Sequence, residues 1–385
     1  MTTPPVLDED FPAPPAHQPS AFEEQASGPL VWVMRIASAL IVPIVLVVLF
    51  FAFDFLRDEE ASKLLQVIVA VIVGVAGVWA LYFGMDRLVN LLPSRAGNAV
   101  RPFMFAGPAM VLLAFYLVYP AVNTTIISFQ DNRSENWVGI DNYITIFTES
   151  KYLISIRNSV AWVILVPLAA VVIGLVFAVM TDRLSKRTEN TTKSLIFLPM
   201  AISFVGASVV WGFIYAFRPE GFGEQIGLMN GIWVGLGNSP VNWLAQQPWN
   251  NLFLMVILIW LQTGFAMVIL SSAIKGVPEV LLEAARIDGA NEWQVFRNVV
   301  YPGISSTVVV VWTTVVITVW KVFDIVWVMT GGRDGTQVIA QQMVQEIFTN
   351  FNYGMGAALA VLLYIAVTPI LVLHVRRFRE QEATR

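Results

Sequence analysis

Two charged side chains, Lys321 and Asp324, interrupt a long apolar stretch near residues 303–330. An ammonium and a carboxylate are disfavoured in an apolar medium, so charges in such a stretch are candidates for a functional site. If the stretch is a single helix, the two residues share one face, because they are three positions apart. Lys321 then lies near one end, where its long side chain can reach a polar surface. The pair therefore either lines a pathway or anchors and packs the helix.

Other reactive groups are scarce. The chain has no Cys, and its two His residues, His17 and His374, are too far apart to suggest a metal site. No GxxxxGK[ST] segment occurs, so the usual phosphate-binding loop of ATP-hydrolysing proteins is missing. The apolar stretches also lack a His/Asp/Glu cluster or a nucleophile–base arrangement. We therefore expect this chain to bind no cofactor or metal and not to be an enzyme.

The composition is that of a membrane protein. Hydrophobic residues make up 57% of the chain and charged residues 13%, which is more apolar surface than a water-soluble protein can hide. Apolar runs of about 18 or more residues indicate membrane spans. Eight such runs occur, near 31–53, 64–85, 103–129, 158–181, 194–217, 251–274, 303–330 and 355–374. The expected fold is all-α, with about eight transmembrane helices.

Charge is distributed unevenly among the segments between these spans. With eight spans both termini share one side, and the segments on that side carry fourteen Lys and Arg residues against seven on the other. The positive-inside rule then places both termini and residues 275–302 in the cytoplasm. Residues 1–29 hold seven Pro, five acidic residues and no Lys or Arg. This composition predicts a disordered acidic, Pro-rich cytoplasmic tail.

Residues 275–302, hereafter the 275–302 loop, are too polar to span a membrane but are patterned as two short helices. Glu279 suits the first turn of the first helix, and Gly289 suits its end. Ala284 and Ala285 have almost no side chain. Another protein surface can therefore approach this helix closely.

The second helix of the loop is expected to begin at Asn291, where Gln294 three residues later predicts a capping box. Trp293 and Phe296 fall on one face of this helix. Pro302 is expected to end it where the next span begins. Two short helices joined at a glycine, on the cytoplasmic side, predict a docking platform for another protein.

This loop resembles that of the permease subunits of binding-protein-dependent ATP-binding cassette (ABC) importers. The family signature is Glu-Ala-Ala, three residues, Gly, nine residues, an aliphatic residue and then Pro. It occurs here as Glu283, Ala284, Ala285, Gly289, Val299 and Pro302. Four more segments resemble the maltose-type carbohydrate branch, and most closely the alpha-glucoside importer permeases: WVGIDNYITIF at 137–147, LIFLPMAISFVGASVVW at 195–211, LIWLQTGFAMVIL at 258–270 and KVFDIVWVMTGG at 321–332.

The resemblance implies a fold and a role for each part of the chain. Residues 101–380 would form a type I ABC importer permease core, and residues 30–100 would add two N-terminal transmembrane helices. The chain would form the translocation pathway for a sugar, an alpha-glucoside such as a disaccharide. The 275–302 loop would be the coupling helix in a groove of the ATPase. Its contact residues would be Glu283, Ala284, Ala285, Asp288 and Gly289.

The same resemblance implies the partners and the location. A second permease subunit would complete a heterodimer, and two copies of a cytoplasmic ATPase would use ATP and Mg²⁺. An extracytoplasmic sugar-binding protein would deliver the substrate. The chain would lie among lipids in the plasma (inner) membrane of a bacterium or archaeon, with no nucleic-acid partner.

A sugar pathway needs neutral hydrogen-bonding side chains beside aromatic ones, because sugars combine hydroxyl groups with weakly apolar faces. Residues of these kinds in the spans are Ser203, Phe204, Gln262, Thr263, Phe265, Thr314 and Thr318. The resemblance adds Trp260 and Leu261, and Lys321 and Asp324 are the charged candidates. Ser, Thr and Gln also join membrane helices to each other, so a packing role remains open.

A transporter driven by an ion gradient is the alternative function. Such transporters use buried carboxylates and often show repeated halves. Here Asp324 is the one carboxylate available inside a predicted span, and no repeated half is visible.

Overall fold

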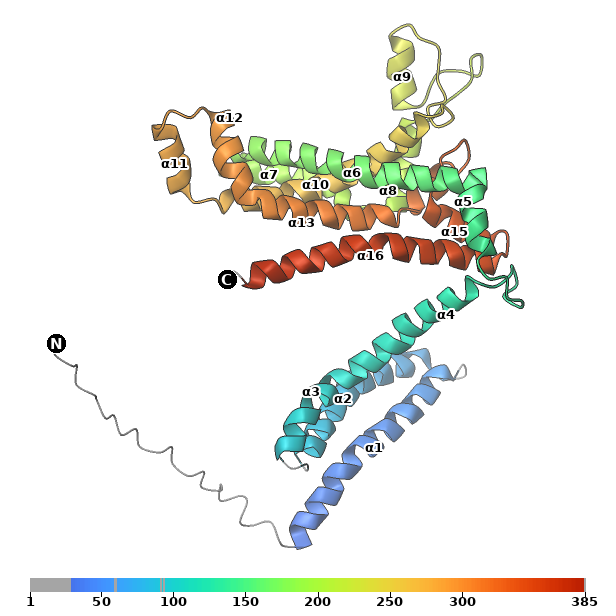
Figure 1. Ribbon diagram of the computed structural model, residues 1–385, viewed down its shortest axis with the longest axis vertical. Coiled ribbons are helices and arrows are strands. Elements are labelled where there is room, and N and C mark those ends of the chain that lie inside the picture. Colours follow the sequence, from blue (N-terminus) through green and yellow to red (C-terminus); the bar gives the residue numbers. More distant parts are fainter. Residues whose placement is uncertain (1–28, 59–60, 91, 93, 384–385) are drawn as a thin grey trace, which may run out of the picture. The chain divides into compact units, whose positions relative to one another are not determined.

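The computed structural model describes residues 29–58, 61–90, 92 and 94–383. Over these residues the chain is largely helical (Figure 1). It divides into two compact units between Tyr119 and Pro120. The predicted tail at 1–29 lies outside the described residues, apart from Pro29, which begins the first helix.

Seven helices in the described part of the chain are long and apolar enough to cross a membrane, and one sharply bent pair can form an eighth span. Most of their surfaces are apolar, as lipid-facing helices require. The predicted all-α fold with about eight spans is confirmed.

The first unit is built on a helical hairpin. Its elements are α1 (Pro29–Arg57), α2 (Lys63–Val89), α3 (Ser94–Leu113) and the π-helical turn η1 (Ala114–Val118). Helices α1 and α2 pack side by side (Figure 1). The amide nitrogen of Gln66 donates to the Asp58 carbonyl oxygen at 2.6 Å, just past the end of α1. A glutamine in the first turn of α2 thus bonds to a carbonyl just past the end of α1.

The second unit is a bundle of long helices with short elements at both ends. Helices α6, α10 and α13 pack together, with α11 and α12 at one end and α5 and α15 at the opposite end (Figure 1). The elements are α4 (Tyr119–Ile127), α5 (Asp141–Thr148), α6 (Ser150–Asp182), α7 (Lys186–Phe197), η2 (Leu198–Ala201), α8 (Phe204–Ile214), α9 (Leu228–Gly235), α10 (Asn250–Lys275), α11 (Glu279–Ile287), α12 (Glu292–Val295), η3 (Phe296–Val300), α13 (Tyr301–Trp320), α14 (Asp324–Met329), α15 (Ile339–Phe348) and α16 (Tyr353–Ala383).

Helix α10 is the centre of this bundle, because small residues let its neighbours approach closely. A Cβ atom added at Gly174 of α6 would lie 2.6 Å from the Ala266 Cβ. One added at Gly264 would lie 2.4 Å from the carbonyl oxygen of Ile196 in α7. Both distances are far below van der Waals contact, so each glycine is needed for close backbone packing. The side chains of α10 that the bundle buries almost completely are Leu254, Met255, Ile257, Leu258, Leu261, Met267 and Leu270.

The fifth predicted span, 194–217, is not one straight helix. Helix α7 and η2 run from Lys186 to Ala201, and α8 continues at an angle of 102° to them. Pro199 has no amide hydrogen and lies in the tighter η2 turn, where the regular helix ends. The Ser203 hydroxyl then accepts from the Gly206 amide at 3.1 Å and caps α8. We call the break at Ile202 and Ser203 the first break.

The seventh predicted span, 303–330, is also interrupted, and the expectation that Lys321 and Asp324 share one helix face is wrong. Helix α13 ends at Trp320, and α14 begins at Asp324. Lys321 therefore lies at a helix C-terminus and Asp324 in a first turn. Both charges are favourable there, because the helix dipole is negative at the C-terminus and positive at the N-terminus. We call residues 321–323 the second break.

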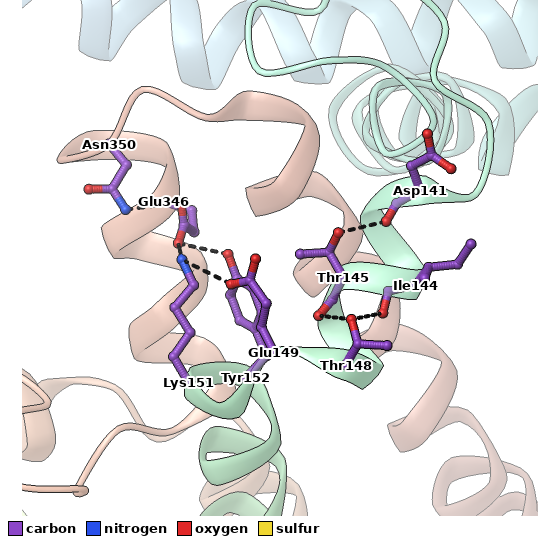
Figure 2. A network of polar contacts seen from close by, with 9 residues as sticks. All are labelled: Asp141, Ile144, Thr145, Thr148, Glu149, Lys151, Tyr152, Glu346 and Asn350. Carbon is purple, nitrogen blue, oxygen red and sulfur yellow. Dashed lines mark hydrogen bonds and ion pairs between the residues drawn. The ribbon is translucent and has the colours of Figure 1, made fainter.

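At the end of the bundle that carries α15, a buried carboxylate ties this helix to α6 (Figure 2). Glu346 Oε1 accepts from Lys151 Nζ at 3.0 Å and from the Tyr152 hydroxyl at 2.9 Å. Its Oε2 accepts from the Asn350 amide at 3.0 Å. Burial acts to raise the pKa of the Glu346 carboxyl, but the hydrogen bonds from Asn350, Lys151 and Tyr152 together outweigh it, so this pKa lies below its ordinary value.

We expect Gly264→Ala to destabilise the bundle, because the added methyl group meets the α7 backbone rather than a movable side chain. Overpacking of this kind costs about 1–3 kcal/mol. The measurement is the melting temperature of the purified protein in detergent. Gly212→Ala is the matched control, since nothing lies within 4 Å of its added Cβ atom. Equal melting temperatures for the two variants would contradict this packing.

We expect Glu346→Gln to flatten the loss of stability in acid. A carboxyl whose pKa is lowered by folding stabilises the protein fully above its unfolded-state pKa, and this contribution disappears as the pH falls through the folded-state pKa. The wild-type melting temperature should therefore fall more steeply between about pH 6 and about pH 3 than that of the variant. Parallel curves would show that the Glu346 network does not link stability to pH.

Candidate functional site

The two breaks lie on elements that pack against each other and against α10. Helix α8 follows the first break and α14 follows the second, and α8 packs on α14 while both pack on α10. Irregular backbone at membrane depth is tolerated where it is enclosed by protein or lines a cavity. Substrate sites of transporters are often built at such discontinuous helices. The breaks beside α10 are therefore the candidate pathway.

Helix α10 brings a polar side chain and aromatic rings to this region. The Gln262 side chain is 8% exposed, and among the described residues none forms a hydrogen bond with its amide. The amide atoms are not among the fully buried polar atoms without a partner, so they reach an open surface, where a ligand or water can bond to them. Phe265, about one turn further along the helix, and Trp260, on a different face, are both partly buried against the core.

The sequence analysis missed Trp211, on α8. Its ring meets that of Trp260 edge to face, with centroids 5.8 Å apart. Its indole nitrogen is buried, with no acceptor among the described residues. A tryptophan N–H normally finds a partner when buried. A Trp well inside a predicted apolar span, where its N–H needs an acceptor, is the signal that could have pointed to it.

The remaining pathway candidates differ in burial and in whether their hydroxyl groups are already hydrogen-bonded within the protein. The Thr314 and Thr318 hydroxyls bond to carbonyls of their own helix at 2.9 Å and 3.1 Å. Thr263 does the same on α10. Leu261 lies in the buried core, whereas Ser203 is exposed at the first break.

Around the second break, Lys321 is exposed and Asp324 is half-buried. No ion pair joins them within the described residues. Phe204 is partly buried against the core on α8, which packs on α14. The structure therefore gathers the elements of the predicted pathway around α10 but does not pair its two charges.

In the 275–302 loop, α11 has an apolar outer face that the sequence analysis also missed. Val280 is 74% exposed and Ile287 is 85% exposed, with Leu281 beside them. Ala284 is exposed between them, whereas Ala285 is partly buried against the protein core. The spacing 280, 284 and 287 places three apolar residues on one helix face, which is the sequence signal for this surface.

The other predicted contact residues of the loop are accessible. Glu283 and Asp288 are exposed, and Gly289 has a φ of 85° at the turn after α11. Residues with a side chain rarely adopt this conformation. The loop therefore turns at a position that favours glycine.

The second part of the loop both confirms and corrects the sequence analysis. Asn291 and Gln294 form the predicted capping box, each side chain accepting from the other's backbone N–H. The expectation that Pro302 ends this helix is wrong. Helix α12 continues through the π-helical turn η3 into α13, and the candidate span runs from Glu292 to Trp320. A wider turn just before a proline accommodates its missing N–H.

Comparison with known proteins identifies the family. Residues 170–380 match the family model described as binding-protein-dependent transport system inner membrane component. The osmoprotective compounds uptake permease protein GgtC of Synechocystis sp. is 51% identical over 282 residues, which cover 73% of this chain and 100% of that protein. The alpha-glucoside transport system permease protein AglF of Rhizobium meliloti is 46% identical over 328 residues, covering 81% of this chain and 97% of that one.

A solved structure shows the same fold. A chain of a bacterial ABC transporter involved in the import of the acidic polysaccharide alginate superposes with a TM-score of 0.64 at 19% sequence identity, covering 74% of this chain and 99% of that chain.

These matches confirm the resemblance seen in the 275–302 loop. They also confirm that the chain is a transport component rather than an ATPase, and they favour ATP-driven transport over the ion-gradient alternative. The chain belongs to the binding-protein-dependent transport system inner membrane components, and it is a multi-pass inner-membrane permease subunit of an ABC importer.

Proposed function

We propose that this permease imports a sugar, an alpha-glucoside such as a disaccharide, along α10 between the two breaks. The observation that carries the proposal is the Gln262 amide, which has no hydrogen-bond partner among the described residues and shares α10 with the partly buried Trp260 and Phe265. No Asp, Glu, Lys or Arg occurs from residue 225 to residue 274. Neutral hydrogen-bonding groups beside aromatic faces suit a sugar.

The relatives support a sugar and leave a second class of substrate to be tested. The Rhizobium relative is named for alpha-glucosides, and the Synechocystis relative for osmoprotective compounds. Some osmoprotectants are sugars, and others, such as glycine betaine, carry a quaternary ammonium group. Such a cation binds to aromatic rings or a carboxylate. The candidate pathway holds aromatic rings and the Asp324 carboxylate as well as the neutral Gln262 amide, so betaine is tested beside the sugars.

The assembly follows from the same proposal. Residues 101–380 form the permease core and residues 30–100 add two helices, with both termini in the cytoplasm. A second permease completes a heterodimer, two ATPase copies bind and hydrolyse ATP with Mg²⁺, and an extracytoplasmic binding protein delivers the sugar. The division of the chain near Tyr119 supports a separate N-terminal unit.

The 275–302 loop docks the ATPase in this proposal. Its exposed apolar residues on α11 form a surface of the kind that marks protein interfaces. Ala284 lies among them and allows close approach, flanked by Glu283 and Asp288. Ala285 contributes from the inner side, where it holds α11 against the protein core.

We expect Ala284→Asp and Ile287→Asp each to abolish co-purification of the ATPase, because each places an unpaired charge in the apolar contact. Membrane insertion should be normal, since neither residue lies in a span. Thr191→Asp adds the same charge on the exposed surface of α7 and is the matched control. Full ATPase association with both loop variants would remove α11 from the docking surface.

We expect the complete complex in proteoliposomes to take up trehalose or maltose, but not glycine betaine, when ATP is supplied. Gln262→Ala should raise the half-saturating sugar concentration, because it removes a hydrogen bond worth about 0.5–1.5 kcal/mol. This corresponds to about a twofold to tenfold change.

Ser272→Ala, on an exposed position of the same helix, is the control for this substitution. Betaine uptake without uptake of either sugar would contradict the proposed substrate. Sugar uptake with unchanged kinetics in Gln262→Ala would remove Gln262 from the pathway.

A further inference from the structure

A buried carboxylate joins α7 to the end of α10. The Glu189 side chain is 6% exposed, and its two oxygens lie 2.6 Å and 2.8 Å from the Lys275 ammonium nitrogen. The Lys193 ammonium also bonds to Glu189, from one turn further along α7. An ion pair of this kind is sensitive to the loss of either partner, because a buried charge is then left uncompensated.

The position of this ion pair in the fold is informative. Lys275 is the last residue of α10, directly before the part of the 275–302 loop that leaves the bundle. Glu189 lies in the first turn of α7, the helix that leads to the first break. The second close contact between these helices, at Gly264 and Ile196, lies just before that break. Helix α7 is thus fastened to α10 both at the loop and next to the break.

Besides its apolar contacts with the core through Ala285 and Val295, the loop is held by exposed ion pairs around an open space. Glu292 pairs with Arg286 at 3.1 Å and with Arg183, at the end of α6, at 3.7 Å. These side chains and Lys275 line a pocket of about 380 Å³ between the loop and the bundle. The pocket leaves room for the loop to move against this part of the bundle. The Glu189–Lys275 pair is a buried polar link at the base of the loop.

We propose that Glu189 is a positioning residue that transmits movement of the 275–302 loop to the first break. The proposal rests on the docking role proposed for the loop. When the ATPase displaces the loop, Lys275 moves with its base, and the ion pair pulls the start of α7. Helix α7 is also in close contact with α10 at Gly264. The displacement therefore reaches Ile202 and Ser203 and changes the angle between α7 and α8.

The two lysines provide a test that separates this role from simple charge neutralisation. Lys275 is on α10, so Lys275→Gln breaks the link between helices. Lys193 is on α7 itself, so Lys193→Gln removes an equal charge from the same carboxylate and leaves that link in place. If the two lysines only neutralised the charge of Glu189, the two substitutions would have equal effects.

The experiment uses Ser203→Cys as a reporter in this Cys-free chain, in the complete complex with Cys-free partner subunits in proteoliposomes. The rate of labelling by a soluble maleimide is measured without nucleotide and after trapping with ATP and vanadate. We expect trapping to change the rate on the order of fivefold or more. Lys275→Gln and Glu189→Gln should abolish this change, and Lys193→Gln should retain it. No sugar is needed for this measurement.

Two further measurements complete the test. The double variant Glu189→Lys with Lys275→Glu should restore the change, because a carboxylate on α10 then faces two lysines on α7. Co-purification of the ATPase should be unaffected in all variants, and its loss would instead report on docking. Equal effects of Lys193→Gln and Lys275→Gln, or labelling at Ser203 that never responds to trapping, would overturn the proposed transmission. Lys275 is half-exposed, so its variant remains informative even if Glu189→Gln does not assemble.

Discussion

Inside a bilayer every backbone N–H and C=O must be bonded within the protein, and this requirement governs where the helices of this chain can be interrupted. Both breaks in the second unit are followed by short helices, α8 and α14, that pack on each other and on α10. Helix α10 remains continuous and buries most of one face. Small residues at its contacts, Gly174 on α6 and Gly264 on α10, bring the backbone of α10 close to those of α6 and α7. An unbroken, closely packed helix thus supports two broken ones, and the candidate pathway follows from that arrangement.

Charge is placed where the surroundings can compensate it. Lys321 and Asp324 lie at helix ends of favourable polarity, and Glu189 and Glu346 are buried with cationic partners. The two buried carboxylates join different helices at opposite ends of the bundle, α7 to α10 and α15 to α6. No Asp, Glu, Lys or Arg occurs in the sequence from residue 225 to residue 274, the stretch that contains Gln262. This division separates the positions that hold the helices together from the surface proposed to bind a neutral substrate.

The sequence alone predicted what depends on local pattern. Span number, the capping box at Asn291 and the turn at Gly289 all follow from residues close together in the chain. The second break could not be predicted in this way. Residues 321–323 contain no Gly or Pro, and the break depends on tertiary packing and helix dipoles. The Glu189–Lys275 pair could not be predicted, since its partners are 86 positions apart. Pro302 misled the sequence analysis, because a π-helical turn absorbs its missing N–H.

The proposed substrate site lies on the face of α10 that carries Phe265, and protection of a single cysteine tests this directly. In the complete complex, Phe265→Cys should react more slowly with a thiol reagent when trehalose or maltose and the binding protein are present. Val256→Cys, on the opposite face of the same helix, should react at the same rate with and without the sugar. Protection at position 256 but not at position 265, or at neither position while the sugar is being transported, would contradict the account.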